Sequence, residues 1–520
     1  MASTPEQIIA EIQELYLSDS LPWIIGYSGG KDSTASLQLI WNAVAALPED
    51  RRRFKPIHVI STDTLVENPI IALWVKASLL KMEIAASQQG LAIHPHHLTP
   101  ALENRFWVNL IGKGYPAPRP KFRWCTDRLK ISASTKFIQD LSEANGEAIL
   151  VLGQRKGESR ARDKVIEQYK TSTRDRLSRN RDPRLSRVWV YLPVESWSSD
   201  DVWEYVIENP NPWGAENQEL FEIYRGATPD AECPIVVDKS TPSCGDSRFG
   251  CYVCTMVTQD KSMAAMILND ESKTWMQPIM DFRDKFLAVD DRQFRDFRRL
   301  NGRITLLRDR LVHGPYSQNR RATLLRELLQ TQVTVRISGE SIGAGNLELL
   351  SLDELQEIRR IWVDDKGEIE DLLPTIYEQV VGKKYPGKEI DPMPLDQQDL
   401  NLLQDVVKEW TSEQHGPDNE IDAAERAAEL FKLTRSLLAT SFRGLQSRKR
   451  SKQLDEVEQL LKAFAFIDEK DALEFAMKHI KDDAAGDTVE EYDAAMEIVY
   501  EPAAEPENRV IPIMNANIIA

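Results

Sequence analysis

A short polar turn between an apolar run and a helical pattern constrains this chain most. Residues 23–27 (WIIGY) are apolar, residues 28–34 (SGGKDST) follow at once, and from Asp32 to Ala46 apolar residues recur at helical spacing. Two consecutive glycines permit tight backbone curvature because no Cβ is in the way. A helix that begins in such a turn presents unpaired N–H groups and the positive end of its dipole. The sequence therefore predicts a strand, a phosphate-binding turn and a helix.

The side chains of this segment, named here the glycine turn, also suit a phosphate. They provide hydroxyl groups and one cation, and we expect Lys31 and Asp32 to lie on a solvent-facing loop. The spacing differs from that of a Walker A loop. The predicted nucleotide contacts of the glycine turn are Ser28, Gly29, Gly30, Lys31, Asp32, Ser33 and Thr34.

Short apolar runs alternate with helical patterns through the first 200 residues. Strands are predicted at 56–62, 91–97, 148–152 and 188–192, a helix at 70–87, and an N-terminal helix capped by Ser3 or Thr4. This alternation predicts an α/β fold with a doubly wound, mainly parallel sheet. The Arg-rich stretch at 155–187 has no periodicity and is expected to be a loop over the functional site without regular structure. After about residue 260 the chain is expected to be almost entirely helical.

A length of 520 residues allows two to four domains at about 150 residues each. The sequence divides into an α/β domain at 1–210, a cysteine-containing segment at 211–260, a helical region at 261–395, and an acidic helical region with an extended tail at 396–520. No apolar run approaches the roughly 20 residues of a membrane helix. The N-terminus lacks the basic start and apolar stretch of a signal peptide, so a soluble cytoplasmic protein is expected.

The net charge of −17 is unevenly distributed. Residues 103–190 contain 20 Lys and Arg against 10 Asp and Glu, an excess of +10, whereas residues 453–507 contain 4 Lys against 17 Asp and Glu, an excess of −13. Such an asymmetry favours a basic functional surface and a solvated acidic end. We expect the basic segment to bind a nucleic acid with salt-sensitive affinity.

Four of the five cysteines fall in one short segment, with the spacing Cys233-x10-Cys244-x6-Cys251-x2-Cys254. In a cytosolic chain this clustering favours a metal site over disulfides. Zinc and an iron–sulfur cluster both accept four thiolates, and the spacing alone leaves the two alternatives open.

The fifth cysteine, Cys125, is separate from this cluster in the sequence. Nearby cations are expected to lower the pKa of its thiol and to make it reactive. These cations are Lys121, Arg123, Arg128 and Lys130.

Three further segments follow predicted strands, where parallel sheets bind ligands. They are residues 61–69 (STDTLVENP), 153–162 (GQRKGESRAR) and 193–203 (PVESWSSDDVW). Arginines directly after a strand suit phosphate contacts, whereas Trp197 and Trp203 are interpreted as core residues. The segments add Asp63, Gly153, Arg155, Glu158, Ser159, Arg160 and Arg162 to the candidate site.

Together these segments resemble the PAPS reductase-like, PP-loop family of adenine nucleotide alpha-hydrolases. Residues 28–33 (SGGKDS) are similar to the PP-loop that grips the pyrophosphate of ATP, and the three segments after the strands resemble further motifs of PAPS reductase-like proteins. Residues 123–130 (RWCTDRLK) and the cysteine spacing extend the resemblance to DNA phosphorothioation proteins of the DndC family. The shared motifs cover roughly residues 20–255.

The resemblance implies an ATP pyrophosphatase and sulfurtransferase that carries a [4Fe–4S] cluster on Cys233, Cys244, Cys251 and Cys254. ATP and Mg²⁺ are the further cofactors implied, and DNA, a cysteine desulfurase and the other Dnd proteins, DndD and DndE, are the implied partners. A DNA phosphate oxygen would attack the α-phosphorus of ATP, and sulfur carried as a persulfide on Cys125 or as a ligand at the cluster would displace AMP. The implied catalytic residues are Cys125, Lys31, Asp32, Arg155 and Arg160.

Three other functions fit parts of the sequence. A PAPS or APS reductase uses a nucleophilic cysteine in a C-terminal tail, whereas the last cysteine of these 520 residues is Cys254. A PP-loop thiolase acting on tRNA would apply the same chemistry to another nucleic acid. A cluster-bearing scaffold without catalysis would have a degenerate nucleotide site, and here the glycine turn is intact.

Overall fold

The computed structural model of the chain describes residues 3–120, 122–157, 163, 166, 173–174, 176–228, 249–299, 304–307, 310–340, 344–388, 397–415, 420–446 and scattered residues between 454 and 477. These residues fall into two compact units. Among the described residues, the first unit contains residues 3–106 and 118–283, and the second contains residues 107–117 and those from 284 to 477. The four-segment division drawn from the sequence stays a prediction.

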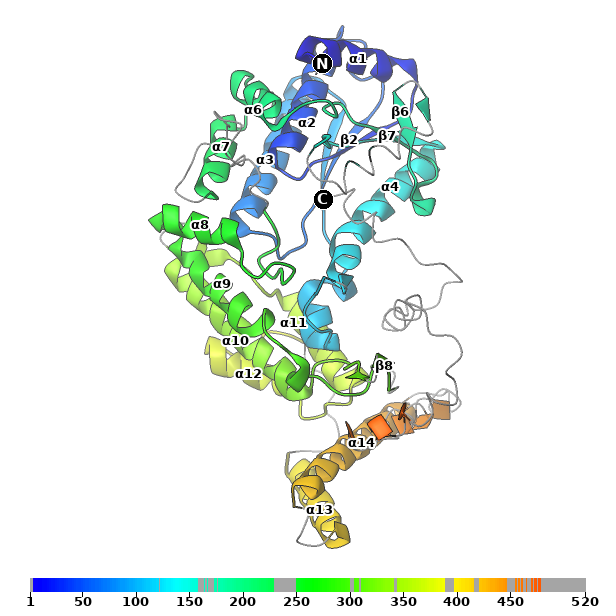
Figure 1. Cartoon of the computed structure of the whole chain (residues 1–520), viewed down its shortest axis with the longest axis vertical. Helices are drawn as coiled ribbons and strands as arrows, with labels where there is room; N and C mark the ends of the chain where they lie inside the picture. Colours follow the sequence, from blue (N-terminus) through cyan, green and yellow to red (C-terminus); the bar gives the residue numbers. More distant parts are fainter. Residues whose placement is uncertain are drawn as a thin grey trace. The chain divides into compact units, whose positions relative to one another are not determined.

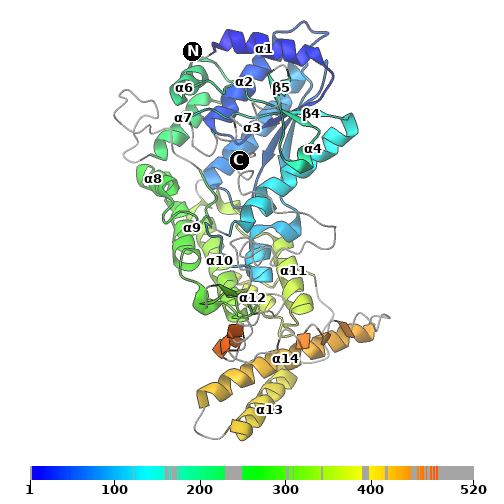
Figure 2. The ribbon, with the colours of Figure 1, turned by 45° about the vertical axis from the view of Figure 1, so that its right-hand side comes forward.

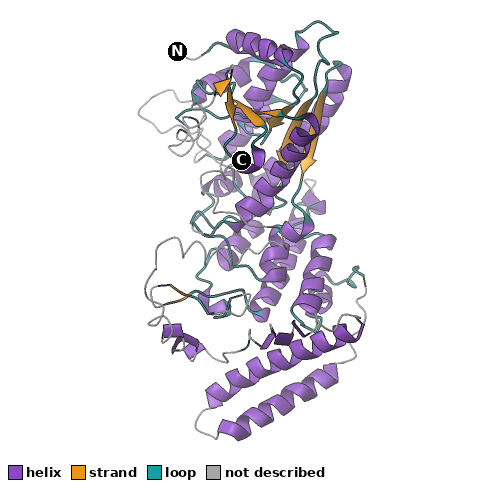
Figure 3. Cartoon of the chain, turned by 90° about the vertical axis from the view of Figure 1, so that its right-hand side faces the viewer, coloured by secondary structure: helices purple, strands orange, loops and turns teal. Residues whose placement is uncertain are grey.

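The first unit is built on a seven-stranded sheet with the order β3-β2-β1-β4-β7-β6-β5. The first five strands of this order pair in parallel, whereas β6 and β5 are antiparallel additions. Figure 3 shows the sheet with helices packed around it, which confirms the predicted α/β fold with a mainly parallel sheet. The strands are β1 Trp23–Gly26, β2 Ile57–Thr62, β3 Ile93–Leu98, β4 Ala148–Val151, β5 Thr173–Arg174, β6 Leu177–Arg179 and β7 Val188–Tyr191.

Helices cover both faces of this sheet, as right-handed crossovers require. In Figure 1, α2 and α3 lie on one side of the strands and α4 on the other. Ile138 of α4 packs with Ile24, Ile60 and Leu150 of the strands in one apolar cluster. The helices of the unit are α1 Pro5–Ser18, α2 Lys31–Ala45, α3 Pro69–Gln88, α4 Ser132–Asn145, α6 Ser199–Glu208, α7 Asn217–Gly226, α8 Lys261–Asn269 and α9 Gln277–Phe282, and a π-helical segment, Thr126–Ile131, precedes α4.

Local signals at two helices are confirmed. Thr4 caps α1: its hydroxyl accepts the Gln7 N–H at 3.4 Å, and the Thr4 N–H donates to Gln7 Oε1 at 3.0 Å. Trp197, which precedes the N-cap residue of α6, and Trp203, within α6, are buried core residues.

The prediction of a stretch without regular structure at 155–187 is wrong in part. β5 and β6 form a small antiparallel ribbon on β7, with Ser178 opposite Val190. Strands of two or three residues are too short to show a periodicity, and the free edge of β7 decides their pairing. Most of the residues from 158 to 172 in this stretch lie outside the described ranges, and the predicted place of the stretch over the functional site stays a prediction.

The second unit is mainly helical, as predicted, except for a two-stranded hairpin of β8 Leu306–Leu307 and β9 Arg310–Leu311. α13 and α14 lie side by side (Figure 2). No helix among the described residues is long and apolar enough to cross a membrane, and the predicted extended tail lies outside them. The helices are α10 Gln318–Ser338, α11 Leu352–Arg360, α12 Leu372–Val381, α13 Gln397–His415 and α14 Glu420–Gln446, with π-helical segments at Val108–Lys113 and Ile361–Asp365.

Candidate nucleotide and cysteine site

The glycine turn lies where the chain reverses its direction across the sheet. The chain runs from β1 outward to β2 and β3 and then returns to β4 on the other side of β1. The carboxyl ends of β1 and β4 therefore flank a topological switch point, where open α/β sheets bind ligands. The glycine turn follows β1 and Gly153 follows β4, so the fold brings these two predicted segments to one edge of the sheet.

The backbone around the switch point requires glycine at two positions. Gly29 has a φ of +75°, and a Cβ there would lie 2.4 Å from Val75 Cγ2 and 3.2 Å from Trp74 Cδ1. The Trp74 indole N–H donates to the Gly29 carbonyl at 3.1 Å. A Cβ on Gly153 would lie 2.6 Å from the carbonyl oxygen of Asp32. Close backbone approach, which a side chain would prevent, therefore sets the shape of the site.

The N-terminus of α2 is the predicted phosphate site. Gly30 is its N-cap residue and provides no side-chain cap. The Ser33 hydroxyl donates to the Gly30 carbonyl at 3.0 Å and accepts the Ser28 N–H at 3.3 Å. The Lys31 N–H reaches the Tyr224 hydroxyl at the long distance of 3.4 Å. This weakly capped helix start can bind an anion through its N–H groups and dipole.

Lys31 is buried, with 6% of its surface exposed, so its predicted place on a solvent-facing loop is wrong. It is the first residue of α2, and its Nζ lies 5.4 Å from the centroid of the Tyr224 ring and 3.8 Å from Asp32 Oδ2. The Trp203 ring packs edge-on against Tyr224 at 5.1 Å. The sequence does not show that α6 and α7 cover the turn. A cation among aromatic rings interacts more strongly with an anion than one in water.

Asp32 and Arg155 form an ion pair across the switch point. The Arg155 Nε–H donates to Asp32 Oδ1, and the guanidinium is buried. Arg155 comes four residues after the end of β4, whereas Asp32 lies in the first turn of α2. Because a guanidinium carries five N–H donors, this pair orients Arg155 without using its whole donor set. Its predicted contact with phosphate stays a prediction.

Asp63 follows β2, the strand beside β1. Its carboxylate accepts the Leu65 N–H at 2.7 Å and lies 3.4 Å from His97 Nε2. Leu65 has a φ of +63°, a conformation that side chains rarely adopt. Asp63 therefore holds the bend after β2 in this structure, and its predicted nucleotide contact stays a prediction.

The loop after β2 also contacts the part of the cysteine segment that the structure describes. Glu67 and Cys251 form an isolated antiparallel bridge. Thr64 Oγ1 lies 3.4 Å from Cys251 Sγ and 3.1 Å from Glu67 Oε1. The Cys254 N–H donates to the Cys251 carbonyl at 2.9 Å, which closes a tight turn. The cysteine segment is therefore docked beside the strand next to the glycine turn.

Cys125, which is distant in the sequence, lies close enough to this pair to interact electrostatically with Cys254 and Cys251. Burial, followed by the effect of Cys254, raises the pKa of Cys125 to about 11. The predicted lowering of this pKa is wrong because desolvation of the thiolate outweighs the effect of Lys130. Lys130 itself is paired with Glu67, with 3.4 Å between Nζ and Oε1.

Six predicted site residues fall outside the described ranges, namely Glu158, Ser159, Arg160, Arg162, Cys233 and Cys244. Among the residues that the structure describes, no group of three or more His, Cys, Asp and Glu side chains could hold a metal ion. Cys251 and Cys254 nevertheless provide two thiols in one partly buried turn. Two thiols are half of the four thiolate ligands that a zinc or iron–sulfur site of this kind needs. The iron–sulfur and zinc assignments stay predictions.

The sequence analysis did not identify several residues that build these sites. Tyr224 and Trp74 shape the glycine turn, as described above, and Glu67 lies at the cysteines. The buried Arg283 donates through its Nε–H to the Cys254 carbonyl at 2.9 Å. Only Glu67 had a signal, because it belongs to the 61–69 segment that follows a predicted strand.

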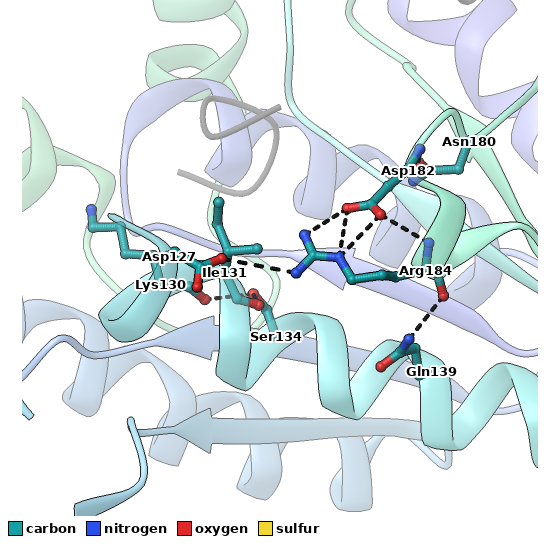
Figure 4. Close-up of polar contacts among 8 residues, drawn as sticks. All are labelled: Asp127, Lys130, Ile131, Ser134, Gln139, Asn180, Asp182 and Arg184. Carbon is teal, nitrogen blue, oxygen red and sulfur yellow. Dashed lines mark hydrogen bonds and ion pairs between the residues drawn. The ribbon is translucent and has the colours of Figure 1, made fainter. Parts of the chain in front are cut away.

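Much of the basic segment at 103–190 is paired with acids. Figure 4 shows Arg184, which donates to the Asp182 carboxylate at 2.8 Å and lies 3.8 Å from Asp127. Arg123 and Arg187 are exposed and make no ion pair with the described residues. The excess of +10 therefore overstates the charge available to a polyanion. Other basic residues of the segment with acidic partners are Lys130, Lys136, Arg155, Lys156, Arg176 and Arg179.

Residues 22–222 match the family model of the phosphoadenosine phosphosulfate reductase domain. This range contains the parallel sheet, the glycine turn and the Gly153 segment, and it is a PAPS reductase-like domain. An uncharacterized protein of Methanocaldococcus jannaschii is 27% identical over 246 residues, which are 47% of this chain. The chain spans only 38% of the length of that relative.

Two solved structures are similar to parts of the chain. One is the phosphoadenylyl-sulfate (PAPS) reductase from Candida auris in its phosphate complex, with 13% identity, a TM-score of 0.23, and coverage of 41% of this chain and 91% of that one. The other is the U34-tRNA thiolase NcsA from Methanococcus maripaludis with its [4Fe-4S] cluster, with 12% identity, a TM-score of 0.25, and coverage of 54% and 76%.

Proposed function

We propose that this chain uses ATP to activate an oxyanion for sulfur transfer, with a phosphate of the DNA backbone as the acceptor. The observation that carries the proposal is the arrangement of two sites at adjacent parallel strands. The glycine turn follows β1, and the Cys251–Cys254 turn is docked on the loop after β2. Adjacent nucleotide and thiol sites allow an activated group to meet sulfur without release. The PAPS reductase-like domain at residues 22–222 supports nucleotide-dependent sulfur chemistry.

The first half of the proposed reaction takes place at the switch point. Lys31 and the N-terminus of α2 hold the β- and γ-phosphates of ATP, and Arg155, oriented by Asp32, faces the α-phosphate. A DNA phosphate oxygen attacks the α-phosphorus, the bond to the bridging oxygen breaks, and pyrophosphate leaves. Mg²⁺, when bound, neutralises part of the charge on the leaving group.

The second half takes place beside the cysteines. A sulfur nucleophile at the oxidation level of sulfide attacks the activated DNA phosphorus, a P–S bond forms, and the P–O bond to AMP breaks. Cys125 carries the incoming sulfur as a persulfide from a cysteine desulfurase. An external thiol reductant attacks Cys125 Sγ, the S–S bond breaks and sulfide is released, and Cys125 is left in a mixed disulfide that a second equivalent of the reductant reduces. The residues proposed to hold a [4Fe–4S] cluster are Cys233, Cys244, Cys251 and Cys254, a set of four thiolates that would ligate all four irons of such a cluster.

DNA is the proposed acceptor because of the basic segment and the family resemblance of its motifs. Arg123 lies two residues before Cys125 and is exposed, so it is placed to contact a backbone phosphate near the thiols. The pairing of neighbouring cations predicts weak DNA binding by the isolated chain. The other Dnd proteins, DndD and DndE, are the proposed partners that supply the remaining affinity.

The deciding experiment deletes the gene and measures phosphorothioate linkages in digested host DNA by mass spectrometry. Complementation with Arg155→Ala should fail, and the purified variant should no longer convert ATP to AMP. The matched control is Lys156→Ala, because Lys156 is the adjacent cation but pairs at 3.2 Å with Glu195 instead of Asp32; it should restore the linkages. Unchanged AMP formation by Arg155→Ala would remove the nucleotide role. Loss of thiolated tRNA nucleosides with unmodified DNA would identify tRNA as the acceptor.

A further inference from the structure

Helix α3 is apolar on two sides. One side is buried in the first unit and includes Trp74, Val75 and Met82. The other side carries a second stripe, named here the α3 stripe, whose larger members are 56%, 58% and 59% exposed. A helix that is apolar all round is normally covered all round, and the described residues leave this stripe open. The α3 stripe consists of Leu73, Ala77, Leu80 and Ile84.

The spacing of the α3 stripe is that of a helix–helix seam. Its members are separated by four, three and four residues, the alternation found at the a and d positions of paired helices. At about 1.5 Å per residue the seam is roughly 16 Å long. Scattered exposed apolar residues are ordinary, but a contiguous stripe marks an interaction surface.

We propose that the α3 stripe pairs with α3 of a second copy of this chain, antiparallel about a twofold axis. The spacing of the stripe is the same in both directions, so its members can meet in register about the twofold axis of an isologous contact. Leu73 faces Ile84 of the second copy, and Ala77 faces its Leu80. The small Ala77 therefore meets a large side chain in each of the two central layers.

The charges beside the stripe fit this pairing. Lys76 and Glu83 are exposed, lie on the same flank of the stripe, and make no ion pair with the described residues. In an antiparallel pair these flanking positions face each other, so Lys76 of each copy meets Glu83 of the other, twice by symmetry. A parallel pair would instead set Lys76 against Lys81, which is unfavourable. The sequence of α3 therefore complements itself in one orientation only.

The consequence is a dimer that joins two nucleotide sites. Trp74 and Val75, on the opposite side of the same helix, hold Gly29 of the glycine turn. A single helix–helix seam of this length buries less surface than the roughly 1,200 Å² typical of stable interfaces. The dimer is therefore reversible and forms as the protein concentration rises. The inference rests on α3 alone and is independent of the proposed reaction.

Sedimentation equilibrium of the full chain over a wide concentration range tests the proposal. The wild type should show a reversible monomer–dimer equilibrium. Leu80→Glu sets a carboxylate from each copy into the seam and should leave monomer at every concentration. The matched control is Ile207→Glu on α6, where a single apolar side chain is 45% exposed; it should dimerise like the wild type. Circular dichroism checks that each variant is folded.

A charge exchange provides a test that does not depend on the apolar core of the seam. Lys76→Glu and Glu83→Lys should each raise the dimer dissociation constant about tenfold, because two attractions become two repulsions. The double variant restores opposite charges and should return to the wild-type constant. A monomeric wild type, a dimer unaffected by Leu80→Glu, or a double variant weaker than both single variants overturns the proposal.

Discussion

Replacing Gly29 by alanine tests whether close approach of α3 holds the glycine turn. At a φ of +75° an L-side chain is strained by about 1–2 kcal/mol. The new Cβ would also lie 2.4 Å from Val75 Cγ2 and 3.2 Å from Trp74 Cδ1. Both neighbours are buried, so displacing them costs about 1–3 kcal/mol. The expected loss in the free energy of unfolding is therefore about 2–5 kcal/mol.

Two companion variants separate strain from contact. Gly90 also has a positive φ, +65°, but nothing lies within 4 Å of a Cβ added there. Gly90→Ala should therefore lose only the strain, about 1–2 kcal/mol. Val75→Ala removes the atom that the alanine at position 29 would meet. The double variant Gly29→Ala/Val75→Ala should be more stable than the sum of its single changes predicts, by about 1–3 kcal/mol.

Urea denaturation followed by tryptophan fluorescence measures these losses, and release of AMP from ATP measures the site. ATP turnover should fall in Gly29→Ala, because its carbonyl can no longer accept the Trp74 indole N–H in the same place, and it should be unchanged in Gly90→Ala. The reasoning is refuted if Gly29→Ala is as stable as Gly90→Ala, or if the changes at residues 29 and 75 are additive.

The remaining predictions concern the aromatic cover, the thiols, the basic segment and one histidine. Tyr224→Phe keeps the ring beside Lys31, so calorimetry should show a smaller loss of ATP affinity for it than for Tyr224→Leu. Tyr224→Leu also removes the cation–π contact, which contributes about 0.5–2 kcal/mol. Cys251→Ser and Cys254→Ser should each lower the iron content of anaerobically purified protein, whereas Cys125→Ser should keep the iron and lose sulfur transfer. Zinc in place of iron would contradict the iron–sulfur assignment. Loss of iron in Cys125→Ser would identify Cys125 as a ligand. DNA affinity should fall with salt, and Arg123→Ala should reduce the slope by about one counterion. Burial, followed by His96 and His94, lowers the pKa of His58 to about 4 from 6.5. On acidification the unfolded chain therefore binds this proton at a higher pH than the folded chain, and the free energy of unfolding should fall between these two pH values. His58→Gln should flatten that part of the pH dependence measured by urea denaturation.

The sheet and its helices could be predicted because their signals are local. The predicted strand at 56–62 and helix at 70–87 agree with β2, Ile57–Thr62, and α3, Pro69–Gln88. Apolar periodicity and cap residues determine such elements before any tertiary contact forms. The ribbon of β5 and β6 has no such signal, because its strands contain only two and three residues and depend on the edge of β7.

The surroundings of the site residues could not be predicted in the same way. Tyr224 lies 193 residues after Lys31, which its hydroxyl contacts, and no spacing rule connects the two. A count of cations near Cys125 also omits the desolvation of its thiolate, which reverses the direction of the pKa shift. Sequence patterns identify candidate groups, but burial and partners determine how these groups behave.

Helix α3 connects the two halves of the candidate site. Its first residue, Pro69, comes two positions after Glu67, which bridges to Cys251, and its second turn carries Trp74 and Val75 against Gly29. A packed helix shifts as a unit because protein interiors resist local deformation. A substitution that pushes Val75 should therefore also disturb the bridge to Cys251. Gly29→Ala should change the rate at which Cys251 reacts with a thiol reagent, whereas Gly90→Ala, beyond the far end of α3, should leave that rate unchanged.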